Sequence, residues 1–153
     1  MKKIIYKIAL FAVVAFSIPA VLSSCDKDDD DPANPSSASA KEYFIKNMLN
    51  QQLVVPLATD NSVDITAKFD GMTFTFTDTA TFAGVATAAN NLYSVNGTWS
   101  IDAAYNKITF AFPTANFTDL VFANKQWQFA NRDSATIKLN AVSESDVLYF
   151  KKK

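Results

Sequence analysis

The chain has 153 residues, a formal net charge of −1, no histidine and a single cysteine. Histidine is the commonest general base and transition-metal ligand, so its absence removes the usual basis of both kinds of chemistry. With one cysteine, no intramolecular disulfide can form. Hydrophobic residues make up 49% of the sequence, enough for one core, and we expect a single folded domain that is not an enzyme.

The first residues have the three parts of a secretory signal peptide. Lys2, Lys3 and Lys7 form a basic start, an apolar run covers 8–16, and small residues lead up to Cys25. The ending Leu-Ser-Ser-Cys resembles the lipobox of bacterial lipoproteins. In that family the chain is cut before the cysteine, and acyl chains such as palmitate are attached to it.

This resemblance implies a signal peptide over residues 1–24 and lipid attachment at Cys25. Two or three acyl chains give a lasting membrane anchor, because each buried methylene contributes about 0.8 kcal/mol. Two alternatives stay open. The segment 4–22, with 19 residues, approaches the ~20 that span a bilayer, although Pro19 near its end disfavours an uncleaved helix. Cys25 could also be an ordinary unpaired thiol beside a plain signal peptide.

The residues after Cys25 are strongly acidic. Asp26 is followed by Lys27 and then by four consecutive aspartates, 28–31. Such a run resembles the surface-export signal of Bacteroidota lipoproteins, whereas an aspartate directly after the cysteine implies inner-membrane retention in enterobacteria. We therefore expect an outer-membrane lipoprotein that faces the outside of the cell. Residues 25–38 contain prolines and serines but no large apolar side chain beyond the cysteine, which predicts a disordered tether.

The remaining part, residues 39–153, is predicted to be the folded domain. From Lys41 onward ten lysines and arginines balance ten aspartates and glutamates, so most of the acidity lies in the tether. A neutral domain whose one arginine is Arg132 has no electrostatic footprint for nucleic acid, and we expect no such partner.

A short helix is predicted at the start of this domain, over Ala40–Gln52. Ser39-Ala40-Lys41-Glu42 has the form of a capping box. Four large apolar residues then fall on one helical face: Phe44, Ile45, Met48 and Leu49. We expect this helix to cover an open end or edge of the sheet.

From Val63 onward apolar residues alternate with polar ones, which is typical of half-buried β-strands. The alternating segments are 63–69, 72–76, 93–101, 108–112, 127–129, 137–139 and 148–150. Asp70-Gly71 predicts a two-residue hairpin between the first two segments. Short strands at this spacing indicate an all-β fold, an antiparallel meander that closes into a small barrel, with a β-sandwich as the alternative.

Several passages of this β-pattern carry recognisable residues. They are Gly71–Phe76, Asn96–Asp102 with its Gly-Thr-Trp, and the closing segments 126–129, 135–139 and 147–151. Together they resemble the small lipocalin-like, calycin-type domains of Bacteroidota lipoproteins, which implies a lipocalin-like barrel. Two departures are that Gly97-x-Trp99 lies mid-chain rather than on the first strand, and that segment 53–57, with Pro56, lacks the motif. Arg132 could cover a tryptophan by a cation–π contact.

No spacing of residues points to a catalytic, metal or cofactor site. Glycines 71, 84 and 97 form no phosphate-binding loop. A carboxylate pair could serve glycoside chemistry. The acidic residues of the domain fall mostly at turns and polar strand positions, where we expect solvated surface: Asp64, Asp70, Asp78, Asp102, Asp119, Asp133, Glu144 and Asp146.

Two three-residue motifs resemble O-glycosylation sites of Bacteroidota. They are Asp78-Thr79-Ala80 and Asp133-Ser134-Ala135, with Thr79 and Ser134 as the modified residues. Ordinary turn chemistry is the alternative, because aspartate, serine and threonine stabilise turns with their own side chains.

Large side chains dominate the inward positions of the predicted strands. They are Phe74, Phe76, Trp99, Phe110, Phe112, Trp127, Phe129, Leu148 and Phe150. An eight-stranded barrel either fills its interior with side chains or holds one small ligand, and so many bulky groups favour a filled core over an aromatic pocket. We expect a non-catalytic binding or interaction module for a small apolar molecule, a glycan or an envelope protein. A structural or accessory envelope role is the alternative.

Overall fold

The computed structural model describes residues 37–113, 115, 117–132 and 136–153. The described elements are α1 (Ser37–Asn47), β1 (Gln52–Asp60), β2 (Val63–Asp64), β3 (Thr73–Ala80), β4 (Ala83–Ala89), β5 (Ser94–Ile101), β6 (Lys107–Ala111), β7 (Gln126–Asn131), β8 (Thr136–Ala141) and β9 (Val147–Lys152). Two 3-10 helices join them, η1 (Thr66–Phe69) and η2 (Thr118–Ala123). The predicted signal peptide, Cys25, the acidic run and Ser134 lie outside the described residues.

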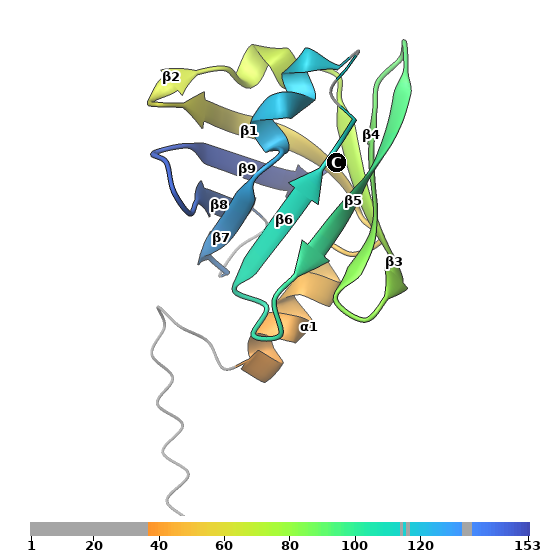
Figure 1. Ribbon diagram of the computed structural model, residues 1–153, viewed down its shortest axis with the longest axis vertical. Coiled ribbons are helices and arrows are strands. Elements are labelled where there is room, and N and C mark those ends of the chain that lie inside the picture. Colours follow the sequence, from red (N-terminus) through yellow and green to blue (C-terminus); the bar gives the residue numbers. More distant parts are fainter. Residues whose placement is uncertain (1–36, 114, 116, 133–135) are drawn as a thin grey trace, which may run out of the picture.

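The strands form one closed antiparallel barrel (Figure 1). From β3 to β9 each strand pairs with the next along the chain, and β1 pairs with both β3 and β9, which closes an eight-stranded ring. The short β2 pairs only with the end of β1, outside the ring. The predicted all-β meander barrel is confirmed, and the sandwich alternative is wrong.

Strand β1, which pairs with both β3 and β9, contains a β-bulge at Pro56 in its pairing with β9. Val54 pairs with Lys151 and Leu57 with Tyr149, so β1 carries one more residue than β9 between these two pairs. Pro56, which has no N–H to donate to a ladder, lies exposed within the bulge, a position where proline is tolerated in a strand. A bulge bends its strand, and here β1 pairs with β3 at its start and with β2 at its end.

Helix α1 covers one end of the barrel, as predicted (Figure 1). Phe44 is buried, with its ring 5.2 Å from that of Trp99 and 5.9 Å from that of Tyr105. Ala40 and Met48, four residues to either side, are buried too. Ile45 is 47% exposed, so its predicted place on the buried face is wrong. It follows the buried Phe44 directly, and the turn of the helix between the two residues points the Ile45 side chain away from the barrel.

The bounds of α1 also differ from the prediction. The helix begins at Ser37, so Ser39 lies inside it and is not the first residue of a capping box. It ends at Asn47, five residues before the predicted end. Asn50 takes a left-handed conformation (φ 57°), which asparagine tolerates, and its N–H donates to the Phe76 carbonyl of β3 at 2.7 Å. The chain is thereby directed into β1.

The predicted strand over 63–69 is wrong after its second residue. The Thr66 N–H donates to Asp64 Oδ1 at 2.8 Å, and Thr66 Oγ1 accepts from the Ala58 N–H at 3.0 Å. These local bonds compete with strand pairing and start η1, whose last residue, Phe69, is buried. Gly71, at φ 71°, turns the chain from η1 into β3, so the Asp70-Gly71 pair makes no hairpin between strands.

Strand β4 was not predicted, because it has no large apolar residue. Its inward positions are Gly84, Ala86 and Ala88, all buried, and its outward positions are half-buried. Phe76 of β3 is paired with Ala86. The small side chains of β4 leave room for the aromatic rings of the strands beside it.

Candidate functional site

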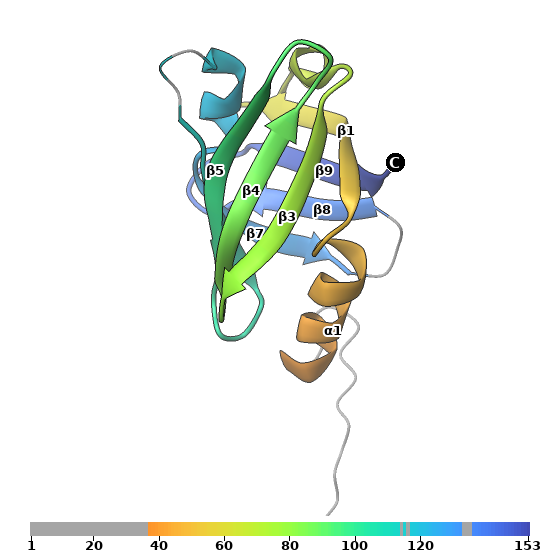
Figure 2. The same cartoon turned by 90° about the vertical axis from the view of Figure 1, so that its right-hand side faces the viewer.

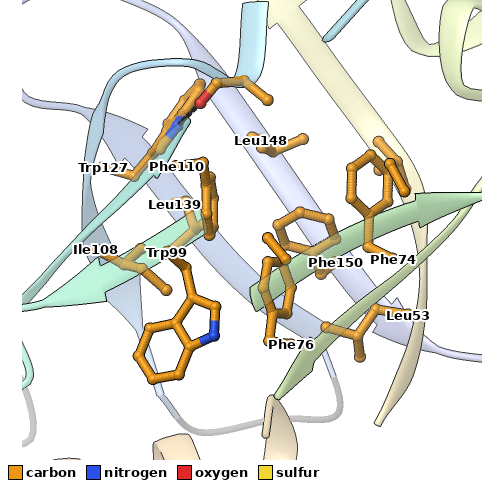
Figure 3. Packing of buried hydrophobic residues seen from close by; sticks show 14 of the residues in the cluster. Leu53, Phe74, Phe76, Trp99, Ile108, Phe110, Trp127, Leu139, Leu148 and Phe150 are labelled. Carbon is orange, nitrogen blue, oxygen red and sulfur yellow. Dashed lines mark hydrogen bonds between the residues drawn. The ribbon is translucent and has the colours of Figure 1, made fainter. Parts of the chain in front are cut away.

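The interior of the barrel is occupied by aromatic side chains. All nine residues expected to point inward are buried: Phe74, Phe76, Trp99, Phe110, Phe112, Trp127, Phe129, Leu148 and Phe150. The ring of Phe76 lies 5.1 Å from that of Phe110 and 5.7 Å from that of Phe150, and the last two are 6.2 Å apart (Figure 3). These rings come from β3, β6 and β9, on different walls, so they meet in the centre. The geometry favours a filled core over a pocket for a small apolar ligand.

Both tryptophans satisfy their polar atom inside the protein. Trp99 Nε1 donates to the Thr77 carbonyl at 2.9 Å, and Trp127 Nε1 donates to the Ala123 carbonyl at 2.9 Å. Neither indole N–H is left to bind a ligand. Their role is to tie strands to one another and to η2.

Arg132 does not cover a tryptophan. Its guanidinium carbon lies 5.2 Å from the centre of the Phe129 ring, and Nη2 donates to the Tyr105 carbonyl and to Asn106 Oδ1, both at 2.7 Å. Burial lowers the pKa of Arg132 from its usual value. The cation beside Trp127 is instead Lys125, whose Nζ lies 5.6 Å from the indole ring. Arg132 therefore joins the β5–β6 turn to the end of β7.

One carboxylate departs from the expected solvated surface. Asp146, before β9, is 1% exposed and pairs with the Lys125 ammonium, while its Oδ1 accepts the Asn61 N–H at 2.8 Å. Burial acts to raise the pKa of Asp146, but the hydrogen bonds from Lys125 and Asn61 outweigh it and hold the pKa below its usual range. Glu144 also pairs with Lys125. The cluster joins three separate turns and is structural.

The other described acidic side chains stay apart. Asp64, Asp70 and Asp78 are exposed, and Asp119 is half-buried. Asp102 Oδ1 accepts the Asn106 and Lys107 N–H groups at 2.6 and 3.2 Å, which closes the β5–β6 turn. Within 37–113, 115, 117–132 and 136–153, no three cysteine, histidine or acidic side chains are close enough together to hold a metal ion.

The outer wall of the barrel carries a groove of about 270 Å³. It opens beside the start of β3, where β1 pairs with β3 only at Gln52 and Leu53. The lining is polar and comes from four separate parts of the chain: Gln52, Gly71, Thr73, Thr75, Thr87, Ala89, Asn90, Asn91 and Lys153. None of these was a predicted site residue. The alternation of β3 places its threonines outward, but only the closed fold brings Gln52 and Lys153 beside them.

Of the two glycosylation candidates, only Thr79 lies among the described residues. It is exposed, near the end of β3, where the pairing with β4 becomes irregular. The side chain is therefore accessible from solvent.

The fold is a helix-capped, eight-stranded antiparallel barrel with an aromatic core and a polar groove on its outer wall. Comparison with known proteins gave no match to a family model, to a curated protein or to a solved structure. In the described part of the chain, no helix is both long and apolar enough to cross a membrane.

Proposed function

We propose that this chain is a bacterial outer-membrane lipoprotein, anchored through acyl chains on Cys25 and facing the outside of the cell. Its lipocalin-like barrel acts as a non-catalytic binding or interaction module. The signal peptide, the lipobox-like Leu-Ser-Ser-Cys and the acidic run support the location. The eight-stranded up-and-down barrel is consistent with the lipocalin-like class. The proposed link to Bacteroidota lipoproteins rests on the sequence resemblance, above all on the acidic run after Cys25.

The contact of Phe76, Phe110 and Phe150 in the barrel centre supports binding at the outer surface of the barrel. Because these rings occupy the interior, a partner has to bind on the outside of the barrel. Ser37, where the chain enters the domain, lies at the end covered by α1, whereas η1, η2 and the β4–β5 turn lie at the other end (Figure 1). The second end and the outer wall are the surfaces away from the entry point.

A second candidate is a structural or accessory envelope protein with no small-molecule ligand. The same filled core favours it, because a packed barrel is a stable body even without a ligand. The two proposals differ in whether the outer surface recognises one particular partner.

The location is tested with intact cells that express the full chain. We expect the mature protein to partition into detergent, its mass to include acyl chains, and external protease to remove the domain. A Cys25→Ser variant is the control and should lose the acyl mass and the membrane association. A domain protected from external protease would contradict the surface assignment, and an unacylated Cys25 in the native protein would contradict the anchor.

The binding role is tested by crosslinking in the same cells. Recovery of one consistent partner, lost when outer-wall residues are changed and kept when other surface residues are changed, is expected for an interaction module. A protein that crosslinks to no consistent partner would favour the structural role.

A further inference from the structure

Charged residues are scarce on the wall formed by β3, β4 and β5, the three strands that lie in front in Figure 2; the exposed Asp78 near the end of β3 is the one charged residue of these strands. Charged residues make up 19% of the whole chain, yet residues 71–101 contain one, Asp78. The outward residues of these strands are threonine, serine, asparagine, alanine and valine: Thr73, Thr75, Thr77, Ala83, Val85, Thr87, Ala89, Ser94, Asn96, Thr98 and Ser100. Protein surfaces normally mix charges of both signs, so this wall is depleted in them.

The groove lies on this wall. Its floor is made by the outward Thr73 and Thr75 of β3 and by Thr87 of β4. The lining also includes Gly71, where an added Cβ would meet nothing within 4 Å. Two further lining residues are joined to each other, because the Lys153 N–H donates to the Gln52 carbonyl at 2.9 Å and holds Lys153 against β1.

The shape of the groove is maintained by hydrogen bonds from two lining residues, Asn90 and Thr87, to neighbours outside the lining. Asn90 Oδ1 accepts the N–H groups of Leu92 and Tyr93, both at 2.9 Å, and so holds the β4–β5 turn. Thr87 Oγ1 donates to Asn96 Oδ1 at 2.9 Å across β4 and β5. These bonds position the floor and one rim before any ligand arrives.

Other polar side chains of the groove have unused hydrogen-bonding capacity. In the described part of the chain, Gln52, Thr73, Thr75 and Asn91 make no side-chain hydrogen bond to another residue of the groove. Hydroxyl and amide groups both donate and accept, which matches a ligand whose groups also do both. Lys153 is the one charged side chain of the lining, and none of the lining residues is aromatic. Charged and aromatic anchors, which typify phosphate sites and protein interfaces, are thus scarce.

We infer that the groove over β3 and β4 binds an uncharged, polyhydroxylated ligand, a segment of a neutral glycan. This inference rests on the proposed function and names the ligand class of that binding module. Without an aromatic platform, the affinity depends on hydrogen bonds to the threonine, asparagine and glutamine side chains. We therefore expect the affinity not to change with salt concentration, because the proposed contacts include no pair of opposite charges that salt would screen.

The test uses the full, lipidated chain in detergent micelles and panels of immobilised neutral and acidic oligosaccharides. We expect binding to one or more neutral oligosaccharides, unchanged between about 0.05 and 0.5 M sodium chloride. The double variant Thr73→Val and Thr75→Val removes two hydroxyls and keeps the β-branched shape, and we expect it to weaken binding about tenfold. Thr109→Val, on the outer face of β6 away from the groove, is the matched control and should bind like the native protein.

Three results would overturn the inference: no neutral oligosaccharide binds, the double variant binds as well as the native chain, or acidic oligosaccharides alone bind and are lost with salt or with Lys153→Ala. Self-association that the double variant abolishes would assign the wall to a second copy and would also overturn it. If these failures occur while the native protein remains acylated, surface-exposed and crosslinked to one partner, the ligand class is wrong and the proposed function stands.

Discussion

The indole of Trp99 passes over Gly84 to reach the Thr77 carbonyl. Gly84 is paired with Trp99 across β4 and β5, and the hydrogen bond from Nε1 to the carbonyl oxygen is 2.9 Å. A Cβ at position 84 would lie 1.8 Å from that oxygen and 2.6 Å from Nε1. The bond exists only because residue 84 has no side chain, so two residues on neighbouring strands depend on each other.

Replacing Gly84 by alanine should therefore destabilise the barrel by about 1–3 kcal/mol, the usual cost of forcing extra atoms into a packed core. Because the Trp99 ring has to move, the near-ultraviolet circular dichroism should change too. Val85→Thr, an outward substitution on the same strand, is the control and should stay within about 0.5 kcal/mol of the native free energy of unfolding. If the Gly84→Ala chain were as stable as the native chain, the hydrogen bond from Trp99 to the Thr77 carbonyl would not depend on the absence of a side chain at position 84.

The filled core predicts that the native barrel does not take up apolar probes. Phe110→Ala removes a ring that touches those of Phe76 and Phe150, and we expect a loss of about 3–5 kcal/mol in the free energy of unfolding. If the cavity persists, the variant should bind a small apolar molecule such as benzene, which calorimetry detects. Binding of the same probe by the native chain would contradict the filled core.

The stability contributed by the packing of helix α1 should depend on Phe44 and not on its neighbour Ile45. Phe44 is buried against Trp99 and Tyr105, whereas Ile45 is largely exposed. We expect Phe44→Ala to cost about 3 kcal/mol and Ile45→Ala to cost less than about 0.5 kcal/mol in denaturant unfolding. A similar loss from both substitutions would mean that the helix packs on a different face.

The ion pair of Asp146 and Lys125 predicts a loss of stability in acid. Hydrogen bonds hold the pKa of Asp146 below its unfolded value of about 3.9, so its contribution is fully present above that pH. It is lost as the pH falls through the lower pKa of the folded protein, and the stability should decrease below about pH 4. Unfolding midpoints measured from pH 7 down to pH 2 would follow this change.

Asp146→Asn should remove much of this acid dependence. At pH 7 we expect the variant to be less stable by about 1.5–3 kcal/mol, the value of hydrogen bonds to a charged group. Glu144→Gln is a useful comparison, because Glu144 is more exposed and its pair with Lys125 should contribute less than about 1 kcal/mol. If both variants keep the native pH profile, other carboxylates cause the acid sensitivity.

The sequence predicted those parts of the fold that carry a local periodic signal. Phe74 and Phe76 alternate with threonines, and such alternation gives both the strand and its inward face. Strand β4 has no such signal, because its inward residues are small. Gly84 and its small neighbours leave space for aromatic rings of other strands, such as Trp99, and the sequence around β4 does not reveal those distant rings. The 63–69 segment has the alternation, but the Asp64 carboxylate bonds to the backbone and starts a 3-10 helix instead.

The candidate site could not be predicted for a related reason. Thr73 and Thr75 look like the ordinary outward residues of a strand, and they become part of a groove only where Gln52 and Lys153 are brought beside them. Asp146 looks like a turn residue in solvent and is buried by its bonds to Lys125 and Asn61. In both cases the deciding contacts join residues far apart in the sequence.

The bond from Lys153 to Gln52 has a practical consequence for protein engineering. A fluorescent reporter or affinity tag joined after Lys153 would start at the rim of the groove, whereas a fusion before Ser37 would start at the end of the barrel covered by α1. Reporters joined at Lys153 should therefore obstruct the groove, and an insertion in the β5–β6 turn would leave it open.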